Sequence, residues 1–465
     1  MKQTYLLLLS MLITSTFNAQ VMLEEDINPG VDNSNPANLT IYEGELYLTA
    51  NNGFTGSELF RFTTANGAEL VEEVNADGNA SVSNFVVFNN TLFFTANGDN
   101  RTGIDLFSFD GVSVNLIELY PDQFSGLFNP LVAYDNIYYV GFDSNFTPNR
   151  LISYNGTTGG EVLGSGVESV IGGNFIDFDG GLLLYMESDN IDVGAELYFY
   201  NIDSGEFSLI KDIDQGTGGS SISEFTKLDN EVYFEAESDL WKTDGTENGT
   251  VIVQTVIDAG VTNVREFYEW NNELYFEGDN GNGDQLWKYN PTTDALTQLS
   301  FISGDNENHD PSDYVIYDGF LYYSAEDGND NESHLWRTDG TSVEQLNDFF
   351  ISVSELGVFD DRIFFRAEEE GVTGNELYSL DPNTLSIQNL NSLSELKIYP
   401  NPTSDSVRFT KDLNGSKYSL FNLSGQLVAE GVIQNNSVDV SSFKGTLLLS
   451  VNNREQQKTF KIISN

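Results

Sequence analysis

One pattern recurs eight times along the chain and constrains its fold more than any other feature. Each copy has an apolar strand, a turn, a second strand with an apolar or aromatic pair, a loop rich in Asn, Asp and Gly, and an acidic or polar residue followed by leucine. These leucines are Leu59, Leu106, Leu151, Leu197, Leu240, Leu286, Leu335 and Leu377. They are 42 to 49 residues apart. A repeat of this period indicates a propeller or a solenoid.

Each copy divides into four short strands. In the first copy, period-two alternation predicts strands at 38–42, 45–50, 58–62 and 69–74, and four strands per unit are typical of a propeller blade. The second strand is apolar on both faces, which predicts burial between adjacent blades. Helical periodicity is absent over any useful length. The sequence therefore predicts an all-β fold, an eight-bladed β-propeller followed by a small C-terminal β-sandwich.

The two ends of the chain differ from the repeats. Residues 1–20 combine Lys2 with an apolar run of about nine residues, as a secretory signal peptide does, and no run approaches the roughly 20 residues of a membrane-spanning helix. Residues 21–30 look like the end of a fourth strand and are predicted to complete the last blade. We expect a propeller over 21–390, a linker over 391–395 and a separate domain over 396–465.

Charge and cysteine content exclude several function classes. The net charge is -52, although residues 395–465 carry eight Lys or Arg against six Asp or Glu. Such a negative field repels nucleic-acid backbones and anionic lipid headgroups, so these partners are not expected. There is no cysteine. The chain therefore has neither a disulfide framework, nor a thiolate metal site, nor a thiol nucleophile.

Two copies contain a more specific motif. Residues 240–246 read Leu-Trp-Lys-Thr-Asp-Gly-Thr, and residues 335–341 read Leu-Trp-Arg-Thr-Asp-Gly-Thr. Both resemble the ELWxxDGT repeat family of bacterial surface and secreted proteins, and the other six copies match approximately. The residues that carry the resemblance are Trp241, Asp244, Gly245, Trp336, Asp339 and Gly340.

The C-terminal segment opens with Leu-Lys-Ile-Tyr-Pro-Asn-Pro at 396–402 and ends in a basic, apolar strand. It resembles a type A sorting domain of the type IX secretion system. The matching positions are Tyr399, Pro400, Asn401, Pro402, Gly425 and Gly445. Thr446 departs from the family, which usually has an aromatic residue there. The resemblance implies the secretion machinery as a partner, export through the periplasm, and a secreted or outer-surface location.

Nothing in the sequence points to a catalytic site. His309 and His334 are the two histidines, and neither lies in a motif; we expect His334 to be an exposed loop residue. Nucleophile elbows, zinc-binding helices and phosphate loops are all missing. Paired carboxylates could still cleave glycosides, but spacing selects no pair. No catalytic residue is assigned, and whether the chain is an enzyme stays open.

Two sets of acids are candidates for binding. One precedes the repeating leucine as Glu58, Asp105, Glu196, Asp239 and Glu376, for which a solvated strand edge is the expectation. The other lies in the loops 278–284 and 326–332, where oxygen-bearing side chains alternate as in calcium loops. The calcium candidates are Asp279, Asp284, Asp327 and Asp330. The alternative is a set of turns that bond their own backbone.

The function expected from the sequence is that of an exported binding, adhesion or scaffold propeller. Its ligand would be a protein or a glycan held by the loops, since propellers are rigid platforms and function resides in loops. The alternatives are a secreted polysaccharide hydrolase and a structural surface-layer component. Apart from calcium, no cofactor is expected.

Overall fold

The computed structural model describes residues 21–464 apart from 77, 100–102, 121–124, 158, 165–166, 190–191, 304–307, 330, 347–348, 383–396, 411–412, 414–416, 423–425 and 454–455. The expected signal peptide at 1–20 and linker at 391–395 lie outside the described residues. The chain divides into a larger compact unit, Met22–Ser379, and a C-terminal unit that begins at Leu380. The two units are described separately below.

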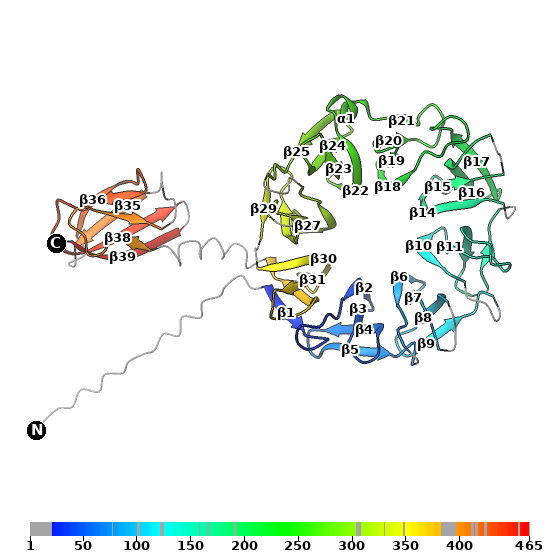
Figure 1. The fold of residues 1–465 in the computed structure, drawn as a ribbon, viewed down its shortest axis with the longest axis horizontal. Coiled ribbons are helices and arrows are strands. Elements are labelled where there is room, and N and C mark those ends of the chain that lie inside the picture. Colours follow the sequence, from blue (N-terminus) through cyan, green and yellow to red (C-terminus); the bar gives the residue numbers. More distant parts are fainter. Residues whose placement is uncertain are drawn as a thin grey trace, which may run out of the picture. The chain divides into compact units, whose positions relative to one another are not determined.

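Eight four-stranded sheets are arranged in a ring about a central axis, which confirms the eight-bladed propeller (Figure 1). The side of the sheets that faces this axis is called the channel below. In blades 1 to 7 the chain enters at the innermost strand and moves outward. Blades 1 to 4 comprise β2 (Ala37–Tyr42), β3 (Glu45–Asn51), β4 (Ser57–Thr63), β5 (Gly67–Glu72); β6 (Ser83–Phe88), β7 (Thr91–Ala96), β8 (Asp105–Phe109), β9 (Val114–Ile117); β10 (Phe128–Ala133), β11 (Asn136–Gly141), β12 (Arg150–Tyr154), β13 (Glu161–Val162); and β14 (Ser169–Phe178), β15 (Gly181–Glu187), β16 (Glu196–Asn201), β17 (Glu206–Lys211).

The second half of the ring repeats this arrangement. Blades 5 to 8 comprise β18 (Ser223–Leu228), β19 (Glu231–Ala236), β20 (Asp239–Thr243), β21 (Val251–Ile252); β22 (Thr262–Trp270), β23 (Glu273–Asp279), β24 (Asp284–Asn290), β25 (Ala295–Gln298); β26 (Ser312–Tyr317), β27 (Phe320–Glu326), β28 (Ser333–Thr338), β29 (Val343–Gln345); and β30 (Phe350–Phe359), β31 (Arg362–Glu369), β32 (Glu376–Leu380) with β1 (Val21–Glu25). One short helix, α1 (Gln254–Asp258), interrupts the strands of the described chain. No described helix has the length and apolar character needed to cross a membrane.

The ring is closed by the first strand of the chain. The order of the last sheet is β1-β32-β31-β30, so β1 supplies the outermost strand of blade 8, as predicted. Glu24 on β1 accepts hydrogen bonds from Ser379 and Arg362. Beyond β1, the backbone N–H of Ile27 donates to the Glu376 carboxylate at 2.8 Å. Closure therefore joins residues about 350 positions apart.

The core lies between blades and explains the repeat. All eight recurring leucines are at most 3% exposed. One cluster joins Tyr47 and Leu59 of blade 1 with Leu92 and Phe94 of blade 2. The second strand of blade 1 is buried from Leu46 to Ala50, which confirms burial on both faces. Because each blade covers its neighbour, no blade can hide its second strand alone.

The acids that precede the leucines are mostly buried, so the expectation of a solvated edge was wrong. Glu58, Asp105, Glu196 and Glu376 are 0% to 1% exposed, and only Asp239 is partly exposed. Their carboxylates accept hydrogen bonds from the loop that crosses to the next blade. For example, Glu58 accepts the N–H of Val74 at 2.7 Å and of Ala80 at 3.3 Å. A buried acceptor is needed here because these N–H groups have left the sheet.

The two histidines are also buried. His334 is 3% exposed on β28, and its Nδ1 lies 2.9 Å from the Phe350 carbonyl, so the expectation of an exposed loop residue was wrong. His309 is fully buried, with Nδ1 2.7 Å from the Glu326 carbonyl and Nε2 3.2 Å from the Tyr323 hydroxyl. Burial lowers the pKa of His309 to about 4. Both side chains tie a loop to a strand, as the neighbouring carboxylates do.

The C-terminal unit contains two sheets around one core. They are β33 (Ile398–Tyr399), β34 (Ser406–Phe409) and β37 (Ser437–Asp439), and β36 (Leu427–Val432), β35 (Lys417–Asn422), β38 (Gly445–Asn453) and β39 (Gln456–Ser464). Val407, Leu420, Leu449 and Ile462 belong to the shared core. This arrangement confirms the small β-sandwich.

Candidate binding site at the central channel

Every innermost strand has a bulge near its start. In blade 1, Ala37 pairs with Thr49 and Thr40 with Tyr47, which leaves Asn38 and Leu39 as the bulged pair. A polar residue occupies the position of Asn38 in all eight blades. The eight positions, here called the channel ring, are Asn38, Asn84, Asn129, Asn174, Glu224, Glu266, Asp313 and Glu355. All except Asn174 have positive φ, and two glycines with positive φ precede Asn174. Asn and Asp tolerate this conformation better than most residues.

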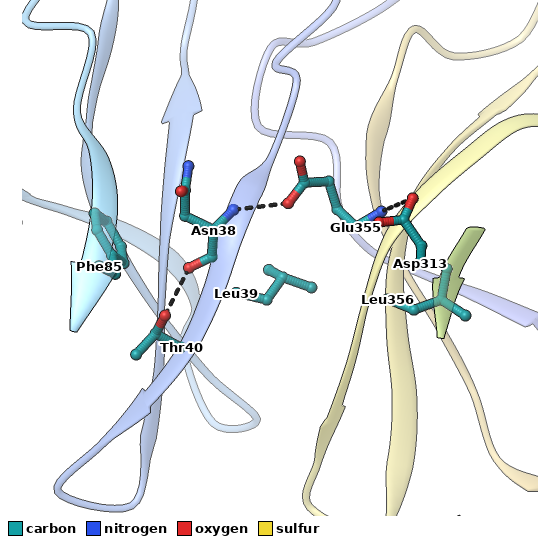
Figure 2. Close-up of a pocket in the computed structure, with 7 residues that line it drawn as sticks. All are labelled: Asn38, Leu39, Thr40, Phe85, Asp313, Glu355 and Leu356. Carbon is teal, nitrogen blue, oxygen red and sulfur yellow. Dashed lines mark hydrogen bonds between the residues drawn. The ribbon is translucent and has the colours of Figure 1, made fainter. Parts of the chain in front are cut away.

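The ring residues connect neighbouring blades (Figure 2). A carboxylate oxygen of Glu355 accepts the N–H of Asn38 at 2.9 Å, and Asp313 accepts the N–H of Glu355 at 3.1 Å. The side-chain oxygen of Asn38 accepts the N–H of Asn84 at 3.2 Å in the same way. A bulge frees a backbone N–H from its ladder, and the preceding blade supplies the acceptor. Capping of these N–H groups therefore requires an acceptor but not a charge, whereas Asn129 and Asn174 donate their amide N–H groups to carbonyls of the next blade.

The two halves of the ring differ in chemistry. Blades 1 to 4 contribute four asparagines, whereas blades 5 to 8 contribute carboxylates from Glu224, Glu266, Asp313 and Glu355. Burial, together with repulsion by Glu224 and Asp313, raises the pKa of Glu266. The channel is thus neutral and polar on one side and acidic on the other.

Two cavities adjoin the ring. The smaller, of about 220 Å³, is lined by ring residues of blades 1, 7 and 8 with Leu39, Thr40, Phe85 and Leu356 (Figure 2). The larger, of about 500 Å³, is lined by ring residues of blades 2 to 5 with aromatic and apolar neighbours. Since each lining draws on three or more blades, both cavities open on the channel rather than between two adjacent sheets.

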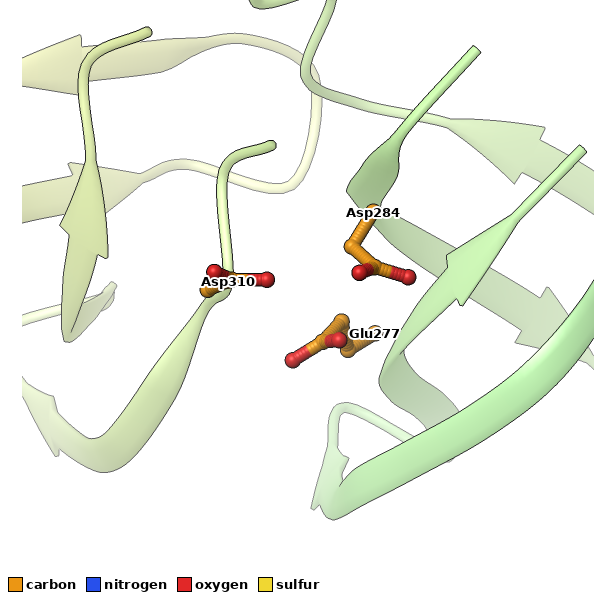
Figure 3. Close-up of side chains that lie close together, drawn as sticks. All are labelled: Glu277, Asp284 and Asp310. Carbon is orange, nitrogen blue, oxygen red and sulfur yellow. The ribbon is translucent and has the colours of Figure 1, made fainter. Parts of the chain in front are cut away.

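A second group of titratable side chains lies away from the ring. Glu277, Asp284 and Asp310 bring their carboxylate oxygens within 4.8 Å of one another (Figure 3). The guanidinium of Arg265 contacts all three, at 3.3 Å from Asp284 and 3.6 Å from Asp310. Burial raises the pKa of Glu277 to about 8. Arg265 already supplies a cation here, so the cluster is explained as an ion-pair network between two blades.

The described calcium candidates have different surroundings. Asp284 joins the cluster just described, while Asp279 accepts the N–H groups of Gly281 and Asn282 at 2.7 and 3.1 Å. Asp327 accepts the N–H of Asn329 at 2.8 Å, and Asp330 lies outside the described residues. The bonds of Asp279 and Asp327 are those of turns that bond their own backbone. Calcium binding by these loops stays a prediction.

The Asp-Gly-Thr motifs form turns that fit against the adjacent blade. The Asp339 carboxylate accepts the hydroxyl and the N–H of Thr341 at 2.7 and 2.8 Å, and these bonds lower its pKa to about 2. A Cβ on Gly340 would lie 2.9 Å from the Tyr275 hydroxyl of the preceding blade. Asp244 binds Thr246 in the same way, and a Cβ on Gly245 would lie 3.0 Å from Phe178. The motif therefore joins blades, as do the two tryptophans: Trp336 is in the core cluster of blades 6 and 7, and Trp241 packs against that of blades 4 and 5.

The sorting-motif residues lie at the edge of the C-terminal sandwich. The Asn401 side chain donates to the Lys461 carbonyl at 2.7 Å and accepts the N–H of Ile463 at 2.9 Å. Tyr399 ends β33 and is followed by Pro400, Pro402 comes after Asn401, and Gly445 begins β38 with a φ of 95°. Gly425 lies outside the described residues. The motif thus ties the start of the unit to its last strand.

Comparisons with known proteins identify the C-terminal unit. Residues 397–465 match the family described as the secretion system C-terminal sorting domain. The chain therefore carries a type IX secretion sorting domain and is secreted to the outer surface or the extracellular space. The domain implies interaction with the secretion machinery. No curated protein matches the chain.

Solved structures resemble the chain at low identity. One is PorZ, an essential surface component of the type IX secretion system of Porphyromonas gingivalis, with 12% identity, a TM-score of 0.42, and coverage of 91% of this chain but only 64% of PorZ. Another is the β-propeller domain of the Trilobed protease from Pyrococcus furiosus, with 11% identity, a TM-score of 0.44, and coverage of 68% and 99%. The designed protein Ika8 has 11% identity, a TM-score of 0.44, and coverage of 76% and 98%. These likenesses concern architecture and not activity.

Proposed function

We propose that this exported protein is a binding propeller that holds its ligand at the channel ring. The observation that carries the proposal is the unequal chemistry of eight equivalent positions. Asn38 caps an N–H of the next blade with its amide oxygen, and Asp313 and Glu355 do the same with carboxylates, so this link needs no charge. Asn129 and Asn174 instead donate to carbonyls of the next blade. Four amides on blades 1 to 4 and four carboxylates on blades 5 to 8 give the channel two different faces, and the links between blades do not require the charge of the acidic face.

The cavities support the same proposal. Together they adjoin seven of the eight ring positions, and aromatic side chains line both. Ligand sites are typically concave, with apolar walls and a few fixed polar groups. The ring is held in place because six of its eight side chains bond to the next blade, and Asn84 donates to Thr95 of its own blade. Such preorganisation limits the entropy lost on binding.

We further propose that the propeller belongs with the ELWxxDGT repeat proteins and that this motif builds blades rather than the site. Trp241, Trp336 and the two Asp-Gly turns all contact neighbouring blades. The position of the ring at the start of each first strand is independent of these motifs. The proposed boundaries of the propeller are residues 21–390.

The test compares two charge reversals in the full secreted chain. Glu266→Lys changes the acidic face of the ring, and Glu206→Lys makes the same change on the exposed strand β17. The probe is an array of neutral, acidic and amino polysaccharides, together with intact cells of the secreting strain that lack the gene. We expect the wild type and Glu206→Lys to bind at least one of these surfaces and Glu266→Lys to lose that binding. Equal binding by both variants, or no binding by the wild type, would refute the proposal.

A further inference from the structure

The larger cavity differs from the rest of the channel in its hydrogen-bonding groups. Asn84, Asn129 and Asn174 reach it from three consecutive blades. Their amide NH2 groups all donate within the protein: Asn84 to the Thr95 hydroxyl at 2.8 Å, Asn129 to the Gly172 carbonyl at 3.3 Å, and Asn174 to the Ile222 carbonyl at 3.0 Å. In the described part of the chain, no hydrogen bond is donated to their three side-chain oxygens. The cavity wall therefore offers mainly acceptors, and a ligand that supplies several donors fits it best.

Two aromatic rings complete the wall. Phe175 and Phe225 are both partly buried and line the same cavity. Phe225 is held at a centroid distance of 5.8 Å from the core residue Phe234, so its ring has a fixed position. A flat apolar surface beside a row of acceptors suits a molecule that has an apolar face and hydroxyl groups at its edge.

Charge narrows the ligand class further. Glu224 is the one ionisable residue among those that line the cavity, and no Lys or Arg is among them. An anionic group placed there would be desolvated without a cation to pair with it. The net charge of -52 adds long-range repulsion of anions.

We propose that the larger cavity holds uncharged sugar residues. Sugar hydroxyls would donate to the oxygens of Asn84, Asn129 and Asn174, and the C–H face of a pyranose would pack on Phe225. The volume of about 500 Å³ is within the roughly 300 to 1,000 Å³ of typical ligand pockets. This inference rests on the proposed function, since it names the ligand class of the same channel.

The experiment measures binding of soluble tetrasaccharides to the full secreted chain by titration calorimetry at millimolar concentration. The neutral probes are cellotetraose, maltotetraose and N-acetylchitotetraose, and tetragalacturonate is the anionic probe. Phe225→Ala is compared with Phe267→Ala. Phe267 occupies the equivalent bulge position in blade 6 and has an equivalent contact, 6.0 Å from Phe276, but lines neither of the two cavities. The two variants should lose similar stability.

We expect at least one neutral tetrasaccharide to bind and tetragalacturonate not to bind. Phe225→Ala should weaken binding of the neutral probe about tenfold or more, while Phe267→Ala leaves its affinity within about twofold. Equal loss in the two variants, equal binding of tetragalacturonate, or no neutral binding overturns the inference. A different pair of variants decides whether the proposed function holds. It survives if Glu266→Lys still abolishes binding to the array or the cells, and it falls if that variant binds like Glu206→Lys.

Discussion

Removing the Glu376 carboxylate should loosen the N-terminal segment that closes the ring. Glu376 accepts four hydrogen bonds from the segment that follows β1: from the N–H groups of Ile27, Asn28 and Ser34 at 2.8, 3.4 and 3.1 Å, and from the Ser34 hydroxyl at 2.6 Å. Glu376→Ala leaves the N–H groups of Ile27 and Asn28 without this acceptor, whereas the N–H and the hydroxyl of Ser34 keep the Asn375 carbonyl, each at 3.1 Å. Each unsatisfied buried donor costs about 1 to 3 kcal/mol. At the lower bound, the two N–H groups make local opening easier by about 2 kcal/mol.

Glu376→Gln is the informative partner of this variant. Gln285 occupies the equivalent position in blade 6, and its side-chain oxygen accepts the N–H of Ile302 at 3.0 Å and the Ser300 hydroxyl at 2.9 Å. A glutamine oxygen can therefore serve two donors, and we expect a smaller loss of about 1 kcal/mol. Burial raises the pKa of Glu376 to about 7, so the wild-type group is neutral at pH 5.5. There the Gln variant should approach the wild type.

The assay is amide hydrogen exchange of the peptide covering residues 21–36. Because 1.4 kcal/mol corresponds to a factor of ten, Glu376→Ala should speed its exchange about thirtyfold and Glu376→Gln about fivefold, while peptides of blade 4 change little. Glu206→Ala on an exposed strand serves as control. Unchanged exchange in Glu376→Ala would refute the reasoning that this carboxylate holds the N-terminal segment.

Three further predictions concern stability. Burial raises the pKa of Glu58 and Glu376 to about 7 from 4.5, so the folded chain binds their protons more tightly; their contribution is complete below pH 4.5 and is lost as the pH rises through 7. The lowered pKa of His309 has the opposite effect on stability, but only below pH 6.5. Between pH 6.5 and 8 the two carboxyl groups therefore determine the pH dependence, and calorimetry should show a melting temperature that falls as the pH rises. A melting temperature that rises over this range would contradict the prediction. Arg265→Gln should lower the free energy of unfolding in urea by about 2 kcal/mol at pH 8, and by less at pH 5.5, where Glu277 is protonated. The control is Arg61→Gln, which should cost under about 1 kcal/mol because the acidic partners of Arg61 are exposed. Equal losses in the two variants would count against the ion-pair network. Gly340→Ala should destabilise by about 1 to 2 kcal/mol more than Gly319→Ala, because both have positive φ but only the first meets a neighbour, Tyr275; equal melting temperatures would refute the close contact.

The propeller could be predicted because its determinants are local and repeated. The leucine of each copy, such as Leu59, is buried in every blade for the same reason, and alternation placed the strands of blade 1 within one or two residues of β2 to β5. Closure by β1 was also predictable, since residues 21–30 contain the end of a repeat without its beginning.

The channel ring was missed because its signal is weak. A polar residue followed by an apolar one, as in Asn38-Leu39 or Glu224-Phe225, is what any half-buried strand contains. Only the register, with two residues opposite one position, reveals the bulge. Each of the eight copies has such a polar-apolar pair at the start of its first strand. An alignment of the eight copies could therefore have identified the ring.

The buried acids were misjudged for a different reason. Asp and Glu are rarely buried without partners, so composition favoured exposure for Glu58 and Glu376. Their partners are N–H groups of loops 16 or more residues away, or 349 residues away in the case of Ile27. Likewise Asp310, which completes the cluster with Asp284, lies beyond the fourth strand of the blade. Neither the partners of these acids nor the contact of Asp310 with Asp284 can be predicted from the sequence without knowing how the blades pack.

The most direct test of the central claim, a ring closed by its own N-terminus, uses the absence of cysteine from the chain. Glu24→Cys and Ser379→Cys together place one thiol on β1 and one on β32, at side chains that are in contact in the closed ring. Under mild oxidation the folded secreted chain should form this intramolecular disulfide, seen as a cross-linked peptide pair in mass spectrometry, and the urea-unfolded chain should form far less. Oxidation that yields no such pair in the folded chain, or only links between chains, would contradict closure.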